Sequence, residues 1–276
     1  MNIFIVGLGL IGASYASGLS KKEHRVYGYD QSEKVMQQAI EQEIIEPSSS
    51  LEKMKEADLI ILALYPKENV QFIKKHHHLL VFGQVLTDVS GTKSNMMKGI
   101  HNHLPKGVSY TSHHPMAGKE SSGFSNHSST LFDGANLIIV KGERSLPKDE
   151  SLIHHIAKDL NFGKIIVTDA LTHDRLVAFT SQLTHILAVC LMHADHDKET
   201  QSATGDSFRD LTRIAKINEI MWSELFMENK DLLLIIMDNF EQEFKKVKEM
   251  IALGEHHALS TYLRQAREKR DSFDIH

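Results

Sequence analysis

The chain has 276 residues, of which 41% are hydrophobic and 24% are charged, a composition typical of globular proteins large enough for two domains. Its net charge of −5, without a run of Lys and Arg among aromatic residues, argues against nucleic-acid binding. No stretch predicts a membrane span, and the N-terminus lacks the pattern of a secretory signal. With a single cysteine, Cys190, the chain cannot form an intramolecular disulfide, so we expect a cytoplasmic protein.

Strand patterns alternate with helical patterns through the first half of the chain. A helical segment is expected at residues 10–19, and Ser32 is expected to cap a second helix. Strands separated by helices of this length indicate βαβ units. We therefore predict a doubly wound, Rossmann-type α/β domain over residues 1–168, with a mostly parallel sheet between two layers of helices. The predicted strands are residues 2–6, 25–29, 58–63, 84–89, 108–111, 136–140 and 164–168.

The second half, residues 169–276, predicts an all-helical domain. An apolar stripe with helical spacing predicts a helix near residues 176–190, and Cys190 is expected to lie in the core on this stripe. Further helices are expected at residues 214–229, 230–251 and 256–270. Apolar residues occur on more than one helical face, including residues 232–237, which a small domain could hardly bury alone. We therefore expect a homodimer formed through the region after residue 170.

A glycine-rich turn after the first strand predicts a dinucleotide site. Gly7 permits a tight turn, Gly9 permits close approach of a pyrophosphate, and Gly12 permits close packing of helix and strand. Asp30 ends the second strand, where it would accept hydrogen bonds from the ribose hydroxyls of NAD and repel the phosphate of NADP. The cofactor is therefore expected to be NAD. Its expected contacts are Gly7, Gly9, Leu10, Ile11, Gly12, Asp30, Leu64 and Ser90.

Three polar stretches could supply catalytic or substrate-binding side chains near the nicotinamide. Residues 88–94 and 112–120 each leave the carboxyl end of a predicted strand, where open α/β sheets bind ligands. Residues 205–215 combine many polar side chains with the start of an apolar helix.

These stretches carry a resemblance to the prephenate/arogenate dehydrogenase family of tyrosine biosynthesis, which spans residues 3 to about 230. The resemblance implies an NAD-dependent dehydrogenase of two domains, with a helical domain that forms a homodimer and an active site between the domains. It is carried by Gly7–Gly12, Asp88–Lys93, His114-Pro115-Met116-Ala117-Gly118-Lys119-Glu120, Ser181–His185, Asp210–Arg213 and Met221-Trp222.

The resemblance implies roles for single residues. His114 matches the histidine that hydrogen-bonds the ring hydroxyl of the substrate, and Arg213 matches the arginine that binds a substrate carboxylate, with Asp210 as its orienting partner. His185 matches a second histidine that faces the substrate. A helical projection places His185 opposite the apolar stripe, on a face with Asp174, Ser181 and Gln182, which agrees with that role.

The chain also departs from the family pattern. Gly91 stands where the family often has a serine, so a hydrogen bond near the hydroxyl would have to come from Ser90 or Thr92, or be absent. Gln182 stands where many members have histidine, and Lys119 where some have threonine. Because both are expected near the substrate side chain, the choice between prephenate and arogenate stays open.

The expected reaction is NAD-dependent oxidative decarboxylation of prephenate to 4-hydroxyphenylpyruvate, with arogenate as the alternative substrate. His113 is expected to be structural and Trp222 to pack in the core. The run His76-His77-His78 is interpreted as a solvated helix end, and no zinc motif occurs, so no metal is expected. A β-hydroxyacid dehydrogenase would need a lysine within residues 172–195, which contain none, and an NAD-sensing module would lack the His/Arg pair.

Overall fold

The computed structural model describes residues 1–119 and 121–273. The chain divides into two compact units, Met1–Asn229 and Lys230–His276. All seven stretches predicted as strands contain a strand. The elements up to residue 169 are β1 (Asn2–Val6), α1 (Leu10–Leu19), β2 (Arg25–Tyr29), α2 (Glu33–Glu41), η1 (Leu51–Glu56), β3 (Leu59–Leu62), α3 (Pro66–His76), η2 (His77–Leu79), β4 (Val85–Asp88), α4 (Ser94–His101), β5 (Ser109–Tyr110), β6 (Ser112–Pro115), η3 (Phe124–Asn126), β7 (Leu137–Lys141), α5 (Pro147–Asp159) and β8 (Ile165–Asp169).

The first five strands form a parallel sheet in the order β2-β1-β3-β4-β5. The strand order reverses between β1 and β3, and ligands of open α/β sheets bind at the carboxyl ends of the strands at such a point. The turn Gly7–Gly12 follows β1 directly. The topology therefore puts the predicted dinucleotide turn at the switch point of the sheet, as expected for a Rossmann-type domain.

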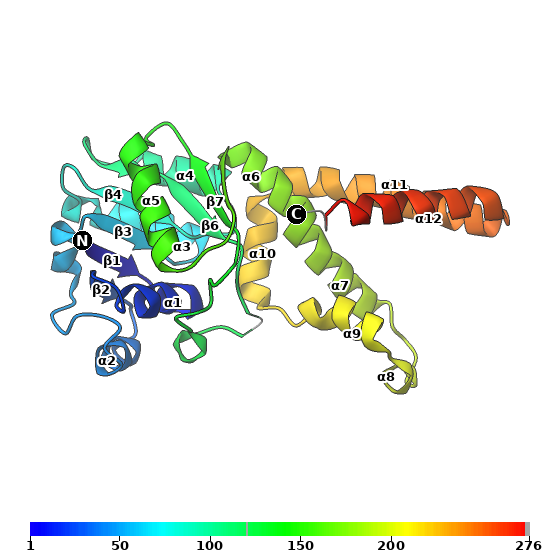
Figure 1. Cartoon of the computed structure of the whole chain (residues 1–276), viewed down its shortest axis with the longest axis horizontal. Helices are drawn as coiled ribbons and strands as arrows, with labels where there is room; N and C mark the ends of the chain where they lie inside the picture. The colour runs from blue at the N-terminus through cyan, green and yellow to red at the C-terminus, as the bar shows by residue number, and fades with distance from the viewer. Residues whose placement is uncertain (120, 274–276) are drawn as a thin grey trace. The chain divides into compact units, whose positions relative to one another are not determined.

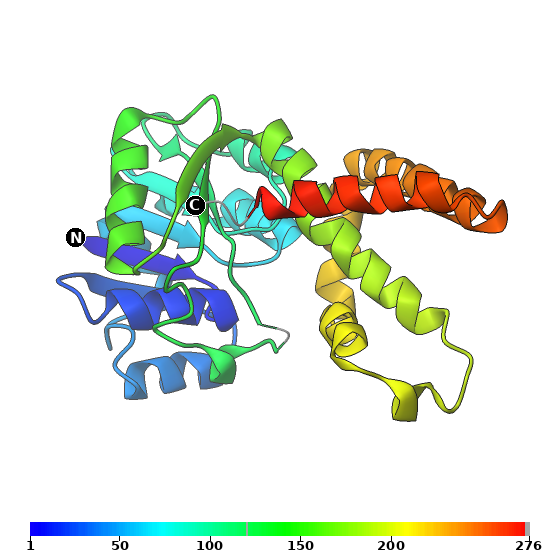
Figure 2. The same ribbon diagram turned by 45° about the vertical axis from the view of Figure 1, so that its right-hand side comes forward.

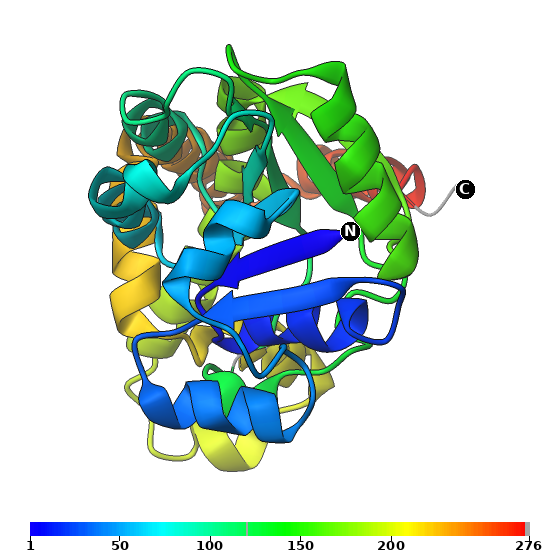
Figure 3. The ribbon, with the colours of Figure 1, turned by 90° about the vertical axis from the view of Figure 1, so that its left-hand side faces the viewer.

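Helices cover both faces of this sheet, and each face has its own apolar core. Phe4 and Ile60 point to the face where α3 and α4 pack, whereas Ile3 and Ile61 point to the face covered by α1 and α5. Figure 3 shows this arrangement, with the teal α3 and α4 to the left of the strands and the green α5 to the right. The alternation of buried side chains along each strand is the reason that a parallel sheet needs helices on both sides.

A second sheet, in the order β6-β7-β8, continues from the first. Its strand β6 pairs antiparallel with β7, with His114 opposite Ile138 and Pro115 opposite Leu137. The sequence indicated only that this stretch leaves a strand. The first sheet's last strand, β5, ends before Thr111, and a new strand, β6, begins at Ser112. His114 is therefore held by backbone hydrogen bonds to β7 and does not lie on a free loop.

One continuous helical segment follows β8. The carboxylate of Asp169 accepts the N–H of Thr172 and so caps α6 (Ala170–Val177), which runs through a π-helical turn, η4 (Ala178–Gln182), into α7 (Leu183–His193). Residues Ala170–His193 are long and apolar enough to cross a membrane, because an 18-residue window within them has a mean hydropathy of 1.5. The expectation that the chain has no such segment was therefore wrong by length and composition.

The burial of this helix differs from what the stripe predicted, because Leu183 on the stripe is buried but other members of the stripe are exposed. Its polar face carries the buried residues Asp174 and Gln182, whereas Phe179 on the apolar stripe is 56% exposed. Cys190 is also exposed, so its placement in the core of the chain was wrong. Asp174 is buried because it accepts hydrogen bonds from the loop after β4, whereas Gln182 is buried by hydrogen bonds with Leu225 and Asn229. Much of the apolar stripe is left uncovered within the first unit.

The first unit ends with short helices. The sequence predicted one helix over residues 214–229, but the chain breaks after η5, and the side chain of Asn218 caps a separate helix, α10. Figure 2 shows the yellow α9 returning alongside α7, which it contacts. These elements are α8 (Thr200–Ala203), α9 (Asp206–Thr212), η5 (Arg213–Ala215) and α10 (Glu219–Glu228).

The second unit is a helical hairpin of α11 (Lys230–Ala252) and α12 (His256–Asp271), which lie side by side in Figure 1. Gly254 turns the chain between them with a φ of 67°, a conformation that glycine adopts readily. Tyr262 on α12 donates a hydrogen bond of 2.8 Å to Glu243 on α11. Both helices agree with the segments predicted from the sequence.

Candidate active site

The glycine turn has the geometry of a phosphate-binding site. Gly7 has a φ of +87°, and a side chain there would collide with Leu64. A Cβ on Gly12 would lie 1.9 Å from the carbonyl oxygen of Gly7, so only glycine fits. A Cβ on Gly9, by contrast, would meet nothing within 4 Å. Gly9 caps α1 without a side-chain hydrogen bond, which leaves the first N–H groups of the helix facing open space suited to an anion.

Asp30 lies at the carboxyl end of β2, where a ribose would be expected. Its Oδ2 accepts the N–H of Leu8 at 2.9 Å, and its Oδ1 accepts the N–H of Ser32 at 2.9 Å. The carboxylate is therefore held in place next to the glycine turn, and each oxygen has capacity for a further hydrogen bond. These contacts fit a role in binding ribose hydroxyls, and they also tie the glycine turn to the second strand.

Asn69 joins two of the residues predicted to contact the cofactor. It is fully buried on α3, exchanges hydrogen bonds of 3.2 Å with the backbone of Leu64, and donates to Ser90 Oγ at 2.9 Å. The sequence analysis did not single out Asn69, because an asparagine in the first turns of an exposed-looking helix carries no signal. Its buried amide holds the loops after β3 and β4 in register at the carboxyl edge of the sheet.

A buried ion pair lies beneath this edge. Lys93 Nζ lies 2.8 Å from Asp88 Oδ1 and donates at 2.8 Å to the carbonyl oxygen of His113, and both side chains of the pair are fully buried. Tyr110 donates to the other oxygen of Asp88 at 2.7 Å. Burial alone would raise the pKa of Asp88, but the Lys93 ammonium outweighs it and holds that pKa below its usual range. The pair locks the loop after β4 onto β6.

His113 has the structural position that the sequence analysis gave it. Its ring is fully buried, with Nε2 2.8 Å from the hydroxyl of Tyr15 and Nδ1 2.7 Å from the hydroxyl of Thr87. Burial, together with the nearby Lys93 ammonium, lowers the pKa of His113 to about 3. A neutral ring can exchange one hydrogen bond with each hydroxyl, so it joins α1, β4 and β6.

His114 is the end of a chain of three side chains. Its Nδ1 lies 2.9 Å from Nε2 of His173, and Nδ1 of His173 lies 2.8 Å from Oδ1 of Asp174. Asp174 also accepts the backbone N–H groups of Lys93 and Ser94 at 2.9 and 2.8 Å. His173 and Asp174 lie in the middle of α6, and neither was predicted to take part in the chemistry. The signals available were the adjacent His-Asp pair and the position of Asp174 on the polar face of the helix.

The charges of the hydrogen-bonded residues Asp174 and His173 determine which ring nitrogen of His114 carries a proton. Burial would raise the pKa of Asp174, but hydrogen bonds from His173 and Ser94 outweigh it, so the group is an ionised acceptor. His173 therefore donates through Nδ1, and its Nε2 accepts from Nδ1–H of His114. Burial and the neighbouring His173 and Lys93 lower the pKa of His114 well below its usual value. His114 is thus neutral, with its Nε2 lone pair available to accept a proton.

Gly91, where the family often has a serine, leaves little room for a side chain. A Cβ on Gly91 would lie 3.3 Å from a methyl group of Leu225 on α10, closer than ordinary contact. Ser90 already accepts a hydrogen bond from Asn69, and Thr92 is 2% exposed with no partner for its hydroxyl among the described residues. Of the two candidates to replace a serine at position 91, Thr92 has a hydroxyl without a partner among the described residues, and Ser90 still has its O–H to donate.

His185 lies in a second group, on α7. Its ring stacks on Trp222 with centroids 3.8 Å apart, and its Nδ1 lies 2.8 Å from the carbonyl oxygen of Ser181. Trp222 was predicted to pack in the core, but it is only half-buried and stacks on His185 near the surface. Gln182 is 1% exposed, donates to the carbonyl oxygen of Leu225 and accepts from Asn229. Its amide joins α7 to α10, which competes with the predicted contact to substrate.

Arg213 and Asp210 lie on the surface of the same half. Arg213 begins η5, which packs against α7, the helix that carries His185. Asp210 lies exposed on α9, three residues before Arg213. Lys119 is also exposed and donates to the carbonyl oxygen of Asn126 at 3.2 Å. The described contacts thus join His114, His173 and Asp174 in one group and place His185 and Arg213 on neighbouring elements of another.

The fold and these two groups define a class. A parallel sheet with a dinucleotide turn at its switch point, beside a histidine held as a proton acceptor, is the construction of a nicotinamide-dependent dehydrogenase. The model of the prephenate dehydrogenase nucleotide-binding domain matches residues 16–165, and the model of the prephenate dehydrogenase dimerization domain matches residues 169–265. The chain belongs to the prephenate dehydrogenase family.

Individual relatives agree with this assignment. A prephenate dehydrogenase of Lactococcus lactis is 31% identical over 99% of this chain and 78% of its own length. A cyclohexadienyl dehydrogenase of Zymomonas mobilis is 26% identical over 98% of this chain and 94% of its own. The solved structure of prephenate dehydrogenase from A. aeolicus with hydroxyphenyl propionate and NAD+ is 28% identical, with a TM-score of 0.88 over 99% of this chain and 98% of that one.

The rival reading as a β-hydroxyacid dehydrogenase has weaker support. A 3-hydroxyisobutyrate dehydrogenase of Mycobacterium tuberculosis is 16% identical and reaches a TM-score of 0.54 over 76% of this chain and 69% of that one. That similarity shows a shared fold alone. The far higher similarity to the prephenate dehydrogenases, over nearly the whole chain, decides the family.

Proposed function

We propose that this chain is an NAD-dependent dehydrogenase that converts prephenate to 4-hydroxyphenylpyruvate by oxidative decarboxylation, a step of tyrosine biosynthesis. The observation that carries the proposal is the hydrogen-bonded chain from Asp174 through His173 to His114, which holds a neutral histidine with a free acceptor nitrogen. The relatives that the chain resembles over almost its whole length act on prephenate, as their names state. Location in the cytoplasm fits the single cysteine.

The residues of the nucleotide-binding half would hold and orient the cofactor. The open N-terminus of α1 at Gly9 suits the pyrophosphate, and the carboxylate of Asp30 suits the ribose hydroxyls. A bound nicotinamide supplies the hydride acceptor. Leu64 and Ser90, which Asn69 joins, border this site at the carboxyl ends of β3 and β4.

The chain's own chemistry is the movement of one proton. His114 accepts the proton of the ring hydroxyl at Nε2 while the carbon that bears this hydroxyl loses hydride. The resulting imidazolium is stabilised through His173 by the charge of Asp174. Arg213 binds a substrate carboxylate with its planar guanidinium, and Asp210 orients it. Loss of the ring carboxylate as CO2 then completes an aromatic ring, which makes the reaction strongly downhill.

Arogenate is the alternative substrate, because it differs from prephenate only in its side chain. The structure favours Lys119 over Gln182 as the group that could meet this side chain, since Lys119 is exposed and the amide of Gln182 is used between helices. An absorbance assay for NADH with prephenate and arogenate offered separately tests the function. If neither prephenate nor arogenate is turned over, the proposal is refuted. A preference for arogenate would make arogenate, and not prephenate, the substrate.

We further propose that residues 169–276 form a dimerisation and substrate domain, and residues 1–168 an NAD-binding domain. The exposed apolar residues of the α6–α7 stripe support a homodimer, because a second copy of the chain could cover them. The exposed members of the stripe include Leu176 and Phe179, and Leu171 and Met192 are further exposed apolar residues of the same helices. Light scattering at micromolar concentration tests this assembly. A monomer mass would refute it, and Phe179→Glu is expected to weaken a dimer without unfolding the nucleotide-binding half.

A further inference from the structure

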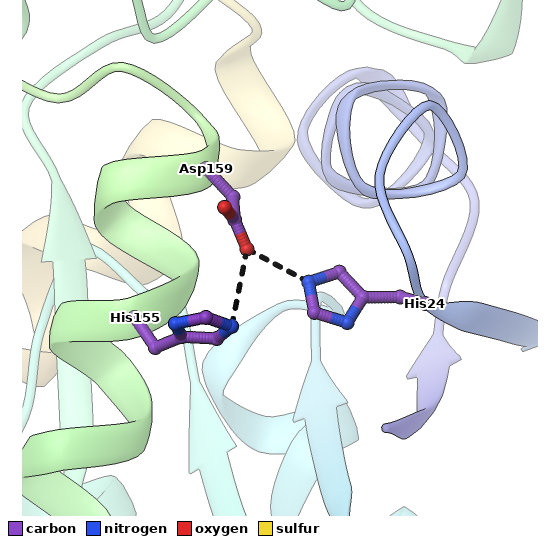
Figure 4. A group of neighbouring side chains, drawn as sticks. All are labelled: His24, His155 and Asp159. Atoms are coloured by element: carbon purple, nitrogen blue, oxygen red, sulfur yellow. Dashed lines mark hydrogen bonds and ion pairs between the residues drawn. The ribbon is translucent and has the colours of Figure 1, made fainter.

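Three side chains on the nucleotide-binding half converge away from the dehydrogenase site. His24 lies in the loop between α1 and β2, and His155 and Asp159 lie one helical turn apart on α5. Their ligand atoms, one from each residue, all lie within 4.8 Å of one another. Figure 4 shows the carboxylate of Asp159 between the two imidazole rings, with Nε2 of each ring directed toward it. We propose that these residues bind a divalent transition-metal ion of the zinc type.

The donor set selects the kind of metal. Two imidazole nitrogens and one carboxylate suit Zn²⁺ and its neighbours in the transition series, whereas Mg²⁺ and Ca²⁺ prefer oxygen ligands alone. Zinc bonds of about 2.0–2.2 Å in tetrahedral geometry separate the donors by about 3.3 Å. Here Nε2 of His24 and of His155 lie 2.8 and 3.5 Å from Asp159 Oδ2. These two separations differ from the tetrahedral value by well under an ångström, and the two imidazole nitrogens lie within 4.8 Å of each other.

The three side chains differ in how far they are exposed to solvent. The side chain of His24 is 5% exposed, that of Asp159 is 21% exposed and that of His155 is 57% exposed. His155 can thus adjust its ring, and the open side of the site leaves a fourth position for water. The Nδ1 atom of His24 is buried without a hydrogen-bond partner among the described residues. The metal would bind Nε2, and the buried Nδ1 would keep the ring proton.

The place of the site in the fold predicts its effect. His24 directly precedes β2, so it lies at the amino end of a strand whose carboxyl end leads to Asp30. The strand has five residues and spans roughly 13 Å, which separates the ion from the nucleotide turn. An ion here would link the α1–β2 loop to the C-terminal turn of α5. We therefore expect the metal to stabilise the fold and to leave the rate of hydride transfer unchanged.

The experiment measures Zn²⁺ binding to the full-length protein, stripped of metal with a chelator, by titration calorimetry and by thermal unfolding. The wild type is expected to bind one Zn²⁺ with a melting temperature that rises on binding. His155→Ala is expected to weaken this binding at least about tenfold, as loss of one ligand should. Co²⁺ in place of Zn²⁺ should give visible ligand-field absorption in the wild type, and weaker absorption at the same Co²⁺ concentration in His155→Ala.

The chain supplies a matched control in the adjacent histidine. His154 lies 3.9 Å from Glu150 in a pair with the same spacing along α5, and no third ligand joins that pair among the described residues. His154→Ala should therefore keep the full affinity for Zn²⁺. Because His155 is largely exposed, its variant should fold normally without metal. Equal Zn²⁺ affinity in the wild type and in His155→Ala, or an equal loss in His154→Ala, would show that His24 and Asp159 form an ion pair only.

Discussion

Nδ1 of His114 lies 2.9 Å from Nε2 of His173, and this contact orients the proposed proton acceptor of the enzyme. Burial lowers the pKa of His173 as well as that of His114, so both rings are neutral. Because Asp174 accepts a hydrogen bond from the other nitrogen of His173, only one arrangement of protons on two neutral rings satisfies these hydrogen bonds. In that arrangement Nε2 of His114 carries no proton. The position of a carboxylate at the start of α6 therefore determines the state of a ring on β6.

His114→Asn should retain NAD binding while kcat falls by about 10²–10⁴-fold, because a positioned proton acceptor contributes on that scale. Asparagine preserves a polar side chain of smaller size in the strand, so the β6–β7 pairing should remain. Steady-state kinetics together with an NAD binding titration measure both effects. Turnover close to that of the wild type would remove His114 from the mechanism.

The roles of His173 and Asp174 can be tested by two variants that are expected to have different effects on kcat. His173→Gln offers an amide oxygen that can still accept from Nδ1–H of His114, so kcat should fall by no more than about tenfold. Asp174→Asn can present its amide N–H to His173, which would reverse every hydrogen bond and place a proton on Nε2 of His114. We expect kcat to fall by about 10²–10⁴-fold in that variant.

Measuring both kcat and the melting temperature of each variant separates an effect on the orientation of His114 from an effect on folding. Asp174 also accepts the N–H groups of Lys93 and Ser94, so Asp174→Asn should lose some stability as well. His173→Leu provides the comparison, because it removes the acceptor for His114 without adding a donor. If His173→Gln and His173→Leu have the same kcat, the hydrogen bond to His114 has no role in catalysis.

Arg213→Ala should raise KM for the substrate while kcat falls much less, because a carboxylate held equally in ground and transition states contributes uniform binding. Breaking a desolvated charge pair costs about 2–5 kcal/mol, which corresponds to about 30- to 4000-fold in affinity. NAD affinity should change by a few-fold at most. A large fall in melting temperature with KM unchanged would reassign Arg213 to a structural role.

Asp30→Ser should weaken NAD and reduce the discrimination against NADP. Loss of hydrogen bonds to a charged acceptor costs about 1.5–3 kcal/mol, or about 10- to 150-fold in the dissociation constant for NAD. Since Asp30 also accepts the N–H of Leu8, the melting temperature of the variant serves as the control. Comparable use of NADP and NAD by the wild type would contradict the role given to Asp30.

The stability of the protein should fall as the pH drops below 6.5, because His113 is held neutral in the folded state. Its pKa is about 3 when folded, against 6.5 for an ordinary histidine, so the unfolded chain binds more protons between these values. The contribution is complete above pH 6.5 and declines by at most about 1.4 kcal/mol per pH unit as the pH falls toward 3. Denaturant unfolding as a function of pH measures this slope. His113→Asn should have a shallower slope than the wild type, and an unchanged slope would exclude His113 as its source.

The sequence by itself determined the alternation of strands and helices, the glycine turn and the family. Apolar runs of four to six residues and glycines that admit no side chain are local signals, as the 1.9 Å approach of a Cβ on Gly12 to Gly7 illustrates. The cap at Ser32 and the acid at Asp30 are local in the same sense, because each bonds to residues that the sequence places nearby or on the adjoining strand.

The tertiary structure alone decided which polar residues meet. The spacing along the chain could not show that Asp174 would bond to the backbone of Lys93, 81 residues away, or that His173 would reach His114, 59 residues away. The same long-range contacts changed the burial predicted for α6 and α7. Periodicity identifies an apolar face but not what lies against it, and here hydrogen bonds to the loop after β4 bury Asp174 on the polar face, while Phe179 and Cys190 on the apolar stripe are exposed.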